Sequence, residues 1–166
     1  MANSNSPYGF RLWSRIASGD GGIPMAPYQL PIPSAATLSV GDPIKSSAGL
    51  GYLAAGTNAI WGILDSPVPG WNETAKQKHY PDILPADDQS IWRVQSIGTV
   101  NVTQGYLGVA AKKYRIGGTT SGYTGIDLSH FTGGVLQVIG LAPGSALGTY
   151  AELLVLITRG AFYGAA

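Results

Sequence analysis

The side chains that could perform acid–base or metal chemistry are few and widely spaced in this chain. There are two histidines, His79 and His130, and no cysteine. His130 follows Asp127 by three residues, a spacing at which one carboxylate and one imidazole could share a proton or a ligand. Zinc sites in proteins need three or four ligands, and no second histidine lies near this pair in the sequence. The pattern therefore favours a capping or solvent-exposed role for Asp127 and His130.

The other motifs that resemble catalytic or nucleotide-binding signatures are incomplete. Asp87-Asp88 is the only adjacent acidic pair, whereas a calcium loop needs several oxygen ligands at alternating positions. Gly49-Leu-Gly51 lacks the third glycine of a dinucleotide-binding fingerprint, and Gly117–Gly122 lacks the Gly-Lys-Ser/Thr ending of a phosphate-binding loop. The sequence also has no Gly-x-Ser-x-Gly motif of a serine nucleophile. We therefore predict no enzyme activity, no metal and no cofactor.

Charged residues are scarce along the whole chain. They make up 11% of the 166 residues, against about 25% in an average soluble domain. The formal net charge is +1 and the longest basic run is Lys112–Lys113, which argues against a nucleic-acid partner bound through its phosphates. A monomer relies on charged groups to stay apart from its copies. The composition therefore predicts a single domain whose surface is largely covered by other chains, in an oligomer or a larger assembly.

Residues 1–35 are rich in proline and predict an extended N-terminal arm. Closely spaced prolines exclude a long helix or a central strand. The arm nevertheless carries many aromatic and aliphatic side chains, unlike a disordered linker. These side chains could lie on another chain or pack over the arm's own domain, and the sequence leaves both possibilities open.

A second irregular stretch, residues 65–89, predicts a long loop that contacts a neighbour or the outside. Loops of this length are uncommon and often functional. Aromatic residues are the usual anchors of protein contacts, so the candidates for contact with a partner protein or another subunit come from the arm and this loop. They are Tyr8, Phe10, Arg11, Trp13, Tyr28, Trp71 and Tyr80.

The remainder of residues 36–166 has the pattern of a β-rich body. Within Ser90–Gln95 the apolar Trp92 and Val94 alternate with the other side chains, which is typical of a half-buried strand. Glu152–Ile157 is apolar on both faces, which predicts a central strand or a subunit contact. No window shows a helical period, so we predict an all-β fold, a small barrel or sandwich. The expected strands are residues 36–40, 44–46, 51–54, 59–64, 90–95, 106–111, 113–116, 135–141 and 151–158.

The N-terminal residues also bear on location. Met1–Phe10 has no basic segment followed by an apolar one, as a signal peptide would. No apolar run approaches the ~18 residues of a transmembrane helix. We therefore expect a soluble chain that is made in the cytoplasm and is not secreted by a classical route.

Several motifs, taken in order, resemble the small decoration (cement) proteins of tailed-bacteriophage heads. The first ten residues resemble that family's small polar start, which ends in Pro-aromatic-Gly. Gly41-Asp-Pro-Ile-Lys45 with Ala59-Ile-Trp-Gly-Ile63 resembles its Gly-Asp-Pro-Val-Lys and Ile-x-Gly-Val pair. Ser90–Gln95 resembles its aromatic-x-Val/Ile-Gln strand. The most telling stretches are Leu136–Leu141 and Ala146–Ile157.

This resemblance implies a β-rich subunit, a homotrimer, on the outer surface of the capsid in the virion. Its partner would be the major capsid protein, and its role would be to bridge neighbouring capsomers against the pressure of the packaged DNA. A second interpretation is a carbohydrate-binding module or adhesion protein. In that case Trp71, Tyr80 and Tyr123 would supply the aromatic platforms on which sugars stack.

Overall fold

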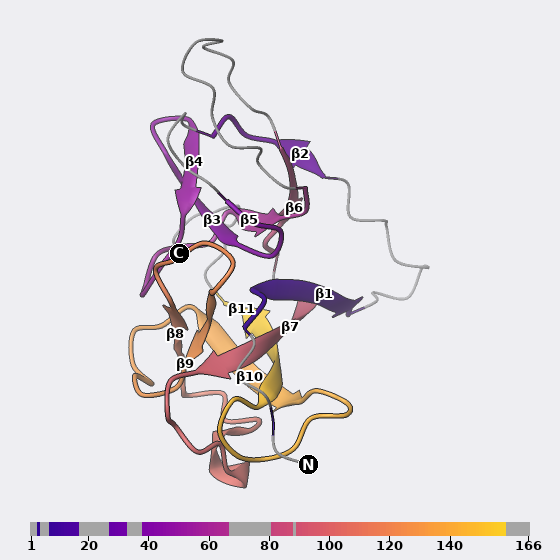
Figure 1. The fold of residues 1–166 in the computed structure, drawn as a ribbon, viewed down its shortest axis with the longest axis vertical. Helices are drawn as coiled ribbons and strands as arrows, with labels where there is room; N and C mark the ends of the chain where they lie inside the picture. The colour runs from indigo at the N-terminus through magenta and orange to yellow at the C-terminus, as the bar shows by residue number, and fades with distance from the viewer. Residues whose placement is uncertain are drawn as a thin grey trace.

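The structure, a computed structural model, describes residues 3, 7–16, 27–32, 38–66, 81–87 and 89–158. Within these residues the chain forms two β-sheets and no α-helix, which confirms the all-β prediction (Figure 1). The sheets stack as an open sandwich and do not close into one barrel. The elements are β1 (Phe10–Arg15), β2 (Tyr28–Gln29), β3 (Pro43–Ser47), β4 (Leu50–Leu53), β5 (Gly62–Leu64), β6 (Asp82–Pro85), β7 (Ser90–Ile97), η1 (Gln104–Tyr106), β8 (Arg115–Gly117), β9 (Gly125–Asp127), β10 (Leu136–Leu141) and β11 (Glu152–Ile157).

The six-stranded sheet, called the large sheet, is organised around β7. Its order is β10-β11-β7-β9-β8, and β1 also pairs with β7. The antiparallel strand β11 lies along one edge of β7. The opposite edge is shared, because β1 pairs with the first part of β7 and β9 pairs in parallel with Ser96 and Ile97 at its end. The alternation in the sequence of β7 places Trp92 and Val94 on the buried face of the sheet and Ile91 and Arg93 on the other face.

The five-stranded sheet, called the small sheet, has the order β2-β6-β5-β3-β4. Its β3–β4 hairpin turns through Ala48 and Gly49, whose φ angles are 51° and 76°. Positive φ at both central residues is the mark of a type I′ turn, which matches the twist of the flanking strands. In Figure 1 the small sheet occupies the upper half of the molecule and the large sheet the lower half, with β1 between them.

The apolar core has two parts that follow the two sheets. The larger part lies against the large sheet and includes the fully buried Trp92 and Tyr114, together with Leu153 and Val155 of β11. The smaller part lies against the small sheet and is centred on Ile44. The alternating side chains that the sequence assigned to one face of β7 thus point into the interior, as expected.

A buried carboxylate ties the small sheet to the loop between β8 and β9. Asp42 is 0% exposed. It accepts hydrogen bonds from the backbone N–H groups of Ser39 and Gly122, both at 2.9 Å, and from the hydroxyl of Ser121 at 2.6 Å. The hydroxyl of Thr124 donates a longer bond of 3.3 Å. Because a buried charge is tolerated only when it is well hydrogen-bonded, this arrangement fixes both loops against each other.

The described part of the predicted arm belongs to the body. Residues 10–15 form β1 in the large sheet, and residues 28–29 form β2 in the small sheet. These residues therefore pack over the arm's own domain, which is one of the two possibilities that the sequence left open. Phe10 is 2% exposed and belongs to the larger core. The prediction that Phe10 contacts a partner is thus corrected, because its ring fills the interior next to β7.

Three other expectations about secondary structure were wrong. Residues 106–111 were expected as a strand, but the chain there leaves the short helix η1 and turns at Gly108, whose φ is 67°. Residues 38–40 lead into the turn at Gly41 and form no strand. The predicted 65–89 loop contains the strand β6, which pairs with both β2 and β5.

Candidate functional site

The side of the large sheet that faces away from the core carries an unusual mixture of apolar and charged side chains. On β11 the residues Leu153, Val155 and Ile157 are buried, whereas the side chains between them are half-buried and point outward. The strand pairing places Leu154 opposite Arg93 and Leu156 opposite Ile91 on β7. We call this surface the outer face. Its members are Arg11, Trp13, Ile91, Arg93, Glu152, Leu154 and Leu156, with Tyr8 at its edge.

Strand β1 contributes Arg11 and Trp13 to the outer face, and a β-bulge orients the second of them. Arg11 pairs with Arg93, and the register then shifts between Leu12 and Ser14. Because a bulge re-aims the side chain of its extra residue, Trp13 turns onto the outer face. There its ring lies 5.6 Å from the Arg93 guanidinium carbon. Trp13 is 44% exposed, so a large aromatic side chain is presented to the surroundings.

A network of charged groups holds this surface in place. Arg93 Nε donates a hydrogen bond of 2.7 Å to Glu152 Oε2, and a second guanidinium nitrogen donates to the same oxygen. This hydrogen bond raises the pKa of Arg93. Burial raises the pKa of Tyr8, and the negative charge of Glu152 raises it further. The guanidinium of Arg11 in turn stacks on the Tyr8 ring at 4.1 Å.

This arrangement has the composition of a protein-contact surface. Contact surfaces between proteins are enriched in aromatic residues and arginine, and their anchors lie among apolar side chains that exclude water. Trp13 and the two outward leucines of β11 supply the apolar part. The Arg93 guanidinium is already held by Glu152 and by the Trp13 ring. A partner that covers Arg93 therefore restricts its side chain at little further cost in entropy.

The structure brings together three of the seven residues that the sequence singled out for contact. Tyr8, Arg11 and Trp13 all lie on or beside the outer face. Tyr28 lies elsewhere, in the small sheet. Its ring packs edge-on against Trp61 at 5.6 Å, its hydroxyl donates to the Trp61 carbonyl at 3.1 Å, and burial raises its pKa. Trp71 and Tyr80 lie outside the described residues, and so does His79.

The remaining members of the outer face were not recognised as contact residues from the sequence. Arg93 and Glu152 are 59 positions apart, and only strand pairing brings them together. For Leu154 and Leu156 a signal was present, because Glu152–Ile157 is apolar on both faces and that pattern already predicted a central strand or a subunit contact. The structure shows that β11 is an internal strand of the large sheet whose second face is half-exposed in this chain.

The pair Asp127 and His130 forms a turn. Asp127 Oδ2 lies 2.9 Å from His130 Nδ1, and Asp127 Oδ1 accepts a bond of 2.9 Å from the Ser129 N–H. Burial alone would raise the pKa of Asp127, but the hydrogen bonds from Ser129 and His130 outweigh it and lower that pKa. In the described part of the chain, no group of three or more potential metal ligands converges at this or any other place.

Of the three aromatic residues proposed to bind carbohydrate, Tyr123 is the one that the structure describes. It lies in the loop between β8 and β9 and is 63% exposed. The two other residues of that platform, Trp71 and Tyr80, lie outside the described residues. Of these three residues Tyr123 alone can be placed, whereas the outer face offers a connected set of side chains.

Comparison with protein-family models, curated proteins and solved structures finds no match. No helix among the described residues is long and apolar enough to cross a membrane.

Proposed function

We propose that this chain is a structural virion protein, a decoration or cement subunit that binds the outside of a bacteriophage capsid. It stabilises the contacts between neighbouring major capsid proteins. The observation that carries this proposal is the outer face, where Trp13 and Leu154 stand half-exposed beside an arginine held by Glu152. The choice of a bacteriophage capsid as the partner comes from the sequence motifs that resemble phage decoration proteins.

The proposal also accounts for the low charge of the chain. The centre of a protein interface is depleted in charged residues, and only 11% of the residues in this chain are charged. A cement subunit acts through several linked contacts, because each contact raises the effective concentration for the next. A homotrimer would present three copies of the outer face to a capsid lattice. Its mass can be measured by light scattering on the purified chain.

The experiment uses heads of the phage that encodes the chain, assembled without it. Purified protein is added and its occupancy per head is measured over a range of concentrations. Leu154→Glu places a second carboxylate in the middle of the outer face, opposite Arg93 and beside Glu152. It is expected to weaken binding by more than about tenfold, because it replaces an apolar contact with a charge that must lose its water when a partner covers it. The matched control is Leu147→Glu, since Leu147 is 47% exposed in the loop between β10 and β11.

The two variants separate the proposal from its alternatives. Wild-type occupancy by Leu147→Glu together with lost occupancy by Leu154→Glu supports the outer face as the capsid contact. Equal occupancy by both variants would show that another surface binds. No occupancy by the wild-type chain at micromolar concentration would remove the capsid as partner.

A further inference from the structure

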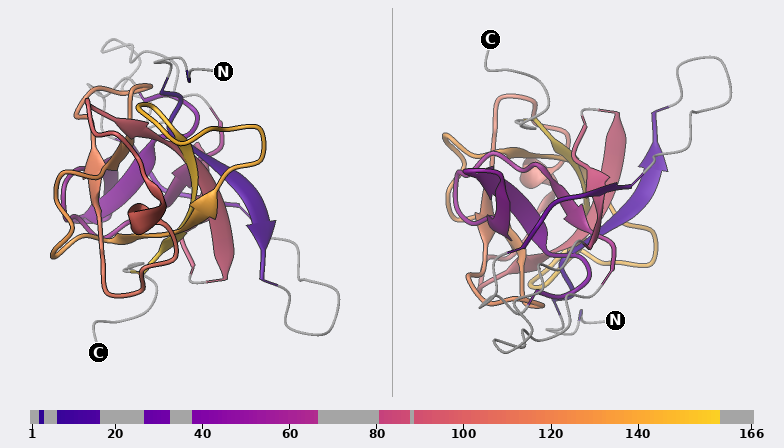
Figure 2. Two further views of the ribbon diagram at one scale, coloured as in Figure 1. Left: turned by 90° about the horizontal axis from the view of Figure 1, so that it is seen from below. Right: turned by 90° about the horizontal axis from the view of Figure 1, so that it is seen from above.

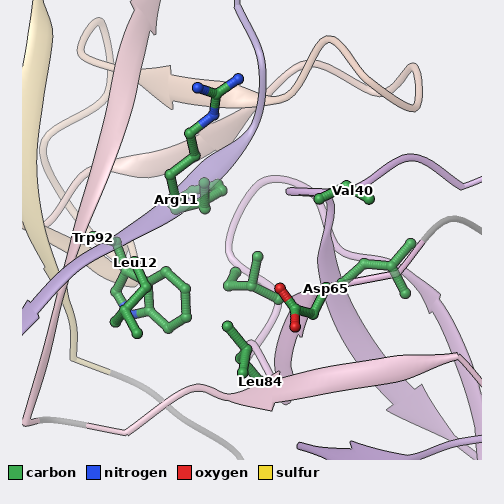
Figure 3. A pocket seen from close by; sticks show the side chains of 9 residues that line it. Arg11, Leu12, Val40, Asp65, Leu84 and Trp92 are labelled. Carbon is green, nitrogen blue, oxygen red and sulfur yellow. The ribbon is translucent and has the colours of Figure 1, made fainter. Parts of the chain in front are cut away.

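A wedge-shaped opening lies between β1 and the small sheet. Its closed end is the hydrogen bond from the Phe10 N–H to the Gly41 carbonyl, 2.8 Å long. Beyond this bond β1 and the chain near Gly41 diverge, and a pocket of about 480 Å³ opens between them. Figure 3 shows this pocket, with Leu12 and Trp92 on one side, Val40 on the other and Leu84 below. We call it the wedge.

On the side of β1 that faces the wedge, the backbone of Leu12 has no strand partner in the part of the chain that the structure describes. In an antiparallel strand, the N–H and C=O groups of successive residues point alternately to the two edges. The Phe10 N–H points away from β7, toward Gly41, so Arg11 points toward β7 and Leu12 points away from it again. Among the described residues, β1 pairs with β7 alone. In both views of Figure 2, β1 accordingly lies at one margin of the body.

The lining of the wedge combines apolar walls with the acidic Asp65 and with Arg11, whose guanidinium stacks on the Tyr8 ring. Leu12 and Val40 are 39% and 50% exposed, unusual values for large apolar side chains that face each other across a pocket. The carboxylate of Asp65 points into the gap between them (Figure 3). Within the described ranges no cation lies close enough to pair with Asp65. The lining of the wedge is thus mostly apolar, and Asp65 is its one carboxylate.

We infer that the wedge receives an extended segment of a different protein chain, which adds to the free edge of β1 as a further strand. Main-chain hydrogen bonds to Leu12 supply affinity, and a pocket for alternate side chains supplies specificity, as in other cases of strand addition. The segment carries a lysine or arginine. Its apolar stem lies against Leu12 and Val40, and its charged end meets the carboxylate of Asp65.

The carboxylate of Asp65 favours a segment with a basic side chain over other occupants of the wedge. An acidic segment or a nucleic-acid phosphate would place a like charge beside Asp65, which disfavours binding. A wholly apolar segment would desolvate the carboxylate without a partner. The wedge lies on the edge of β1 opposite β7, and of its lining residues only Arg11 also belongs to the outer face. A segment can therefore bind in the wedge without contact to Trp13 or Leu154. The inference therefore stands or falls separately from the proposed capsid contact.

The test uses the full chain labelled with nitrogen-15 and two short peptides as probes. Both peptides are acetylated and amidated, consist of alternating threonine and valine, and differ only in a central lysine or glutamate. Amide chemical shifts are followed during titration with each peptide. We expect the lysine peptide to shift the amide resonances of Leu12 and Asp65. It should bind about two- to fivefold more tightly than the glutamate peptide, which is the range that one exposed ion pair allows.

Two variants examine the two parts of the recognition. Asp65→Asn keeps the shape of the side chain and removes its charge, so it should abolish the preference for lysine, whereas the control Asp127→Asn should leave the preference intact. Leu12→Pro removes the outward N–H, which an edge strand tolerates, and should abolish binding of the lysine peptide. Leu12→Ala keeps that N–H and should weaken binding only in part.

Each contrary result overturns the inference. Equal binding of the two peptides, or a lysine preference that survives Asp65→Asn, would remove the role of the carboxylate. Shifts confined to outer-face residues such as Leu154 would move the site elsewhere. A change of oligomeric mass in Leu12→Pro would identify a second copy of this chain as the occupant, in place of a different protein.

Discussion

The guanidinium of Arg93 lies over the indole ring of Trp13, 5.6 Å from its centroid. The two residues come from neighbouring strands, β7 and β1, and the β-bulge after Leu12 is what turns the tryptophan onto the same face as the arginine. The other side of the guanidinium is held by Glu152 of β11. Three strands thus cooperate to hold one aromatic side chain at the surface in a defined position.

Removal of this arginine should affect stability only modestly. Arg93→Gln breaks the ion pair with Glu152 and the stacking on Trp13, and we expect the free energy of unfolding to fall by about 1 kcal/mol, because the pair is partly exposed and screened. Urea denaturation measures the change. Arg11→Gln is the matched control, since Arg11 is exposed and stacks only on Tyr8. Equal losses in the two variants would contradict the special role of Arg93.

Removal of the charge of Asp42 should be much more costly. Asp42→Asn replaces one acceptor oxygen with an amide NH2 group, which then faces two donors, either those of Ser39 and Ser121 or those of Gly122 and Thr124. A buried donor without an acceptor costs about 1–3 kcal/mol, and more when a charged acceptor was lost. Urea denaturation of Asp42→Asn should therefore show a loss of about 3 kcal/mol. Asp65→Asn, at an exposed carboxylate, should change stability by less than about 0.5 kcal/mol.

The turn at Asp127 should make stability depend on pH. The pKa of Asp127 is lowered in the folded state, so its contribution is fully present above the unfolded-state pKa of about 3.9. It is lost as the pH falls through the lower folded-state pKa. The difference in unfolding free energy between wild type and Asp127→Asn should therefore be constant near neutral pH and shrink below about pH 4. A difference that grows on acidification would contradict the assignment.

Local patterns in the sequence predicted the strands but not their partners. The alternation in Ser90–Gln95 and the apolar run in Glu152–Ile157 define β7 and β11, because each reflects which face is buried. Residues 106–111 resembled a strand equally well, yet Gly108 turns the chain there. Local patterns cannot distinguish these cases, since the outcome depends on whether a neighbouring strand is available.

The candidate site was predicted only in part for the same reason. Tyr8 and Trp13 were recognisable as aromatic residues in an otherwise irregular segment. Phe10, two positions from Tyr8, has the same character in sequence but fills the core, because the pairing of β1 with β7 sends it to the opposite face. Arg93 and Glu152 become neighbours through the pairing of β7 with β11. Such long-range register is not visible in a single sequence.

The central claim is that the outer face contacts the major capsid protein, and a photo-crosslink tests it most directly. A benzophenone amino acid is placed at position 154 in one variant and at position 123 in another, each variant is bound to heads that lack the chain, and the heads are irradiated. The account predicts a covalent adduct with the major capsid protein from position 154 and none from position 123. An adduct from Tyr123 alone, or from neither position on heads that bind the chain at full occupancy, would contradict it.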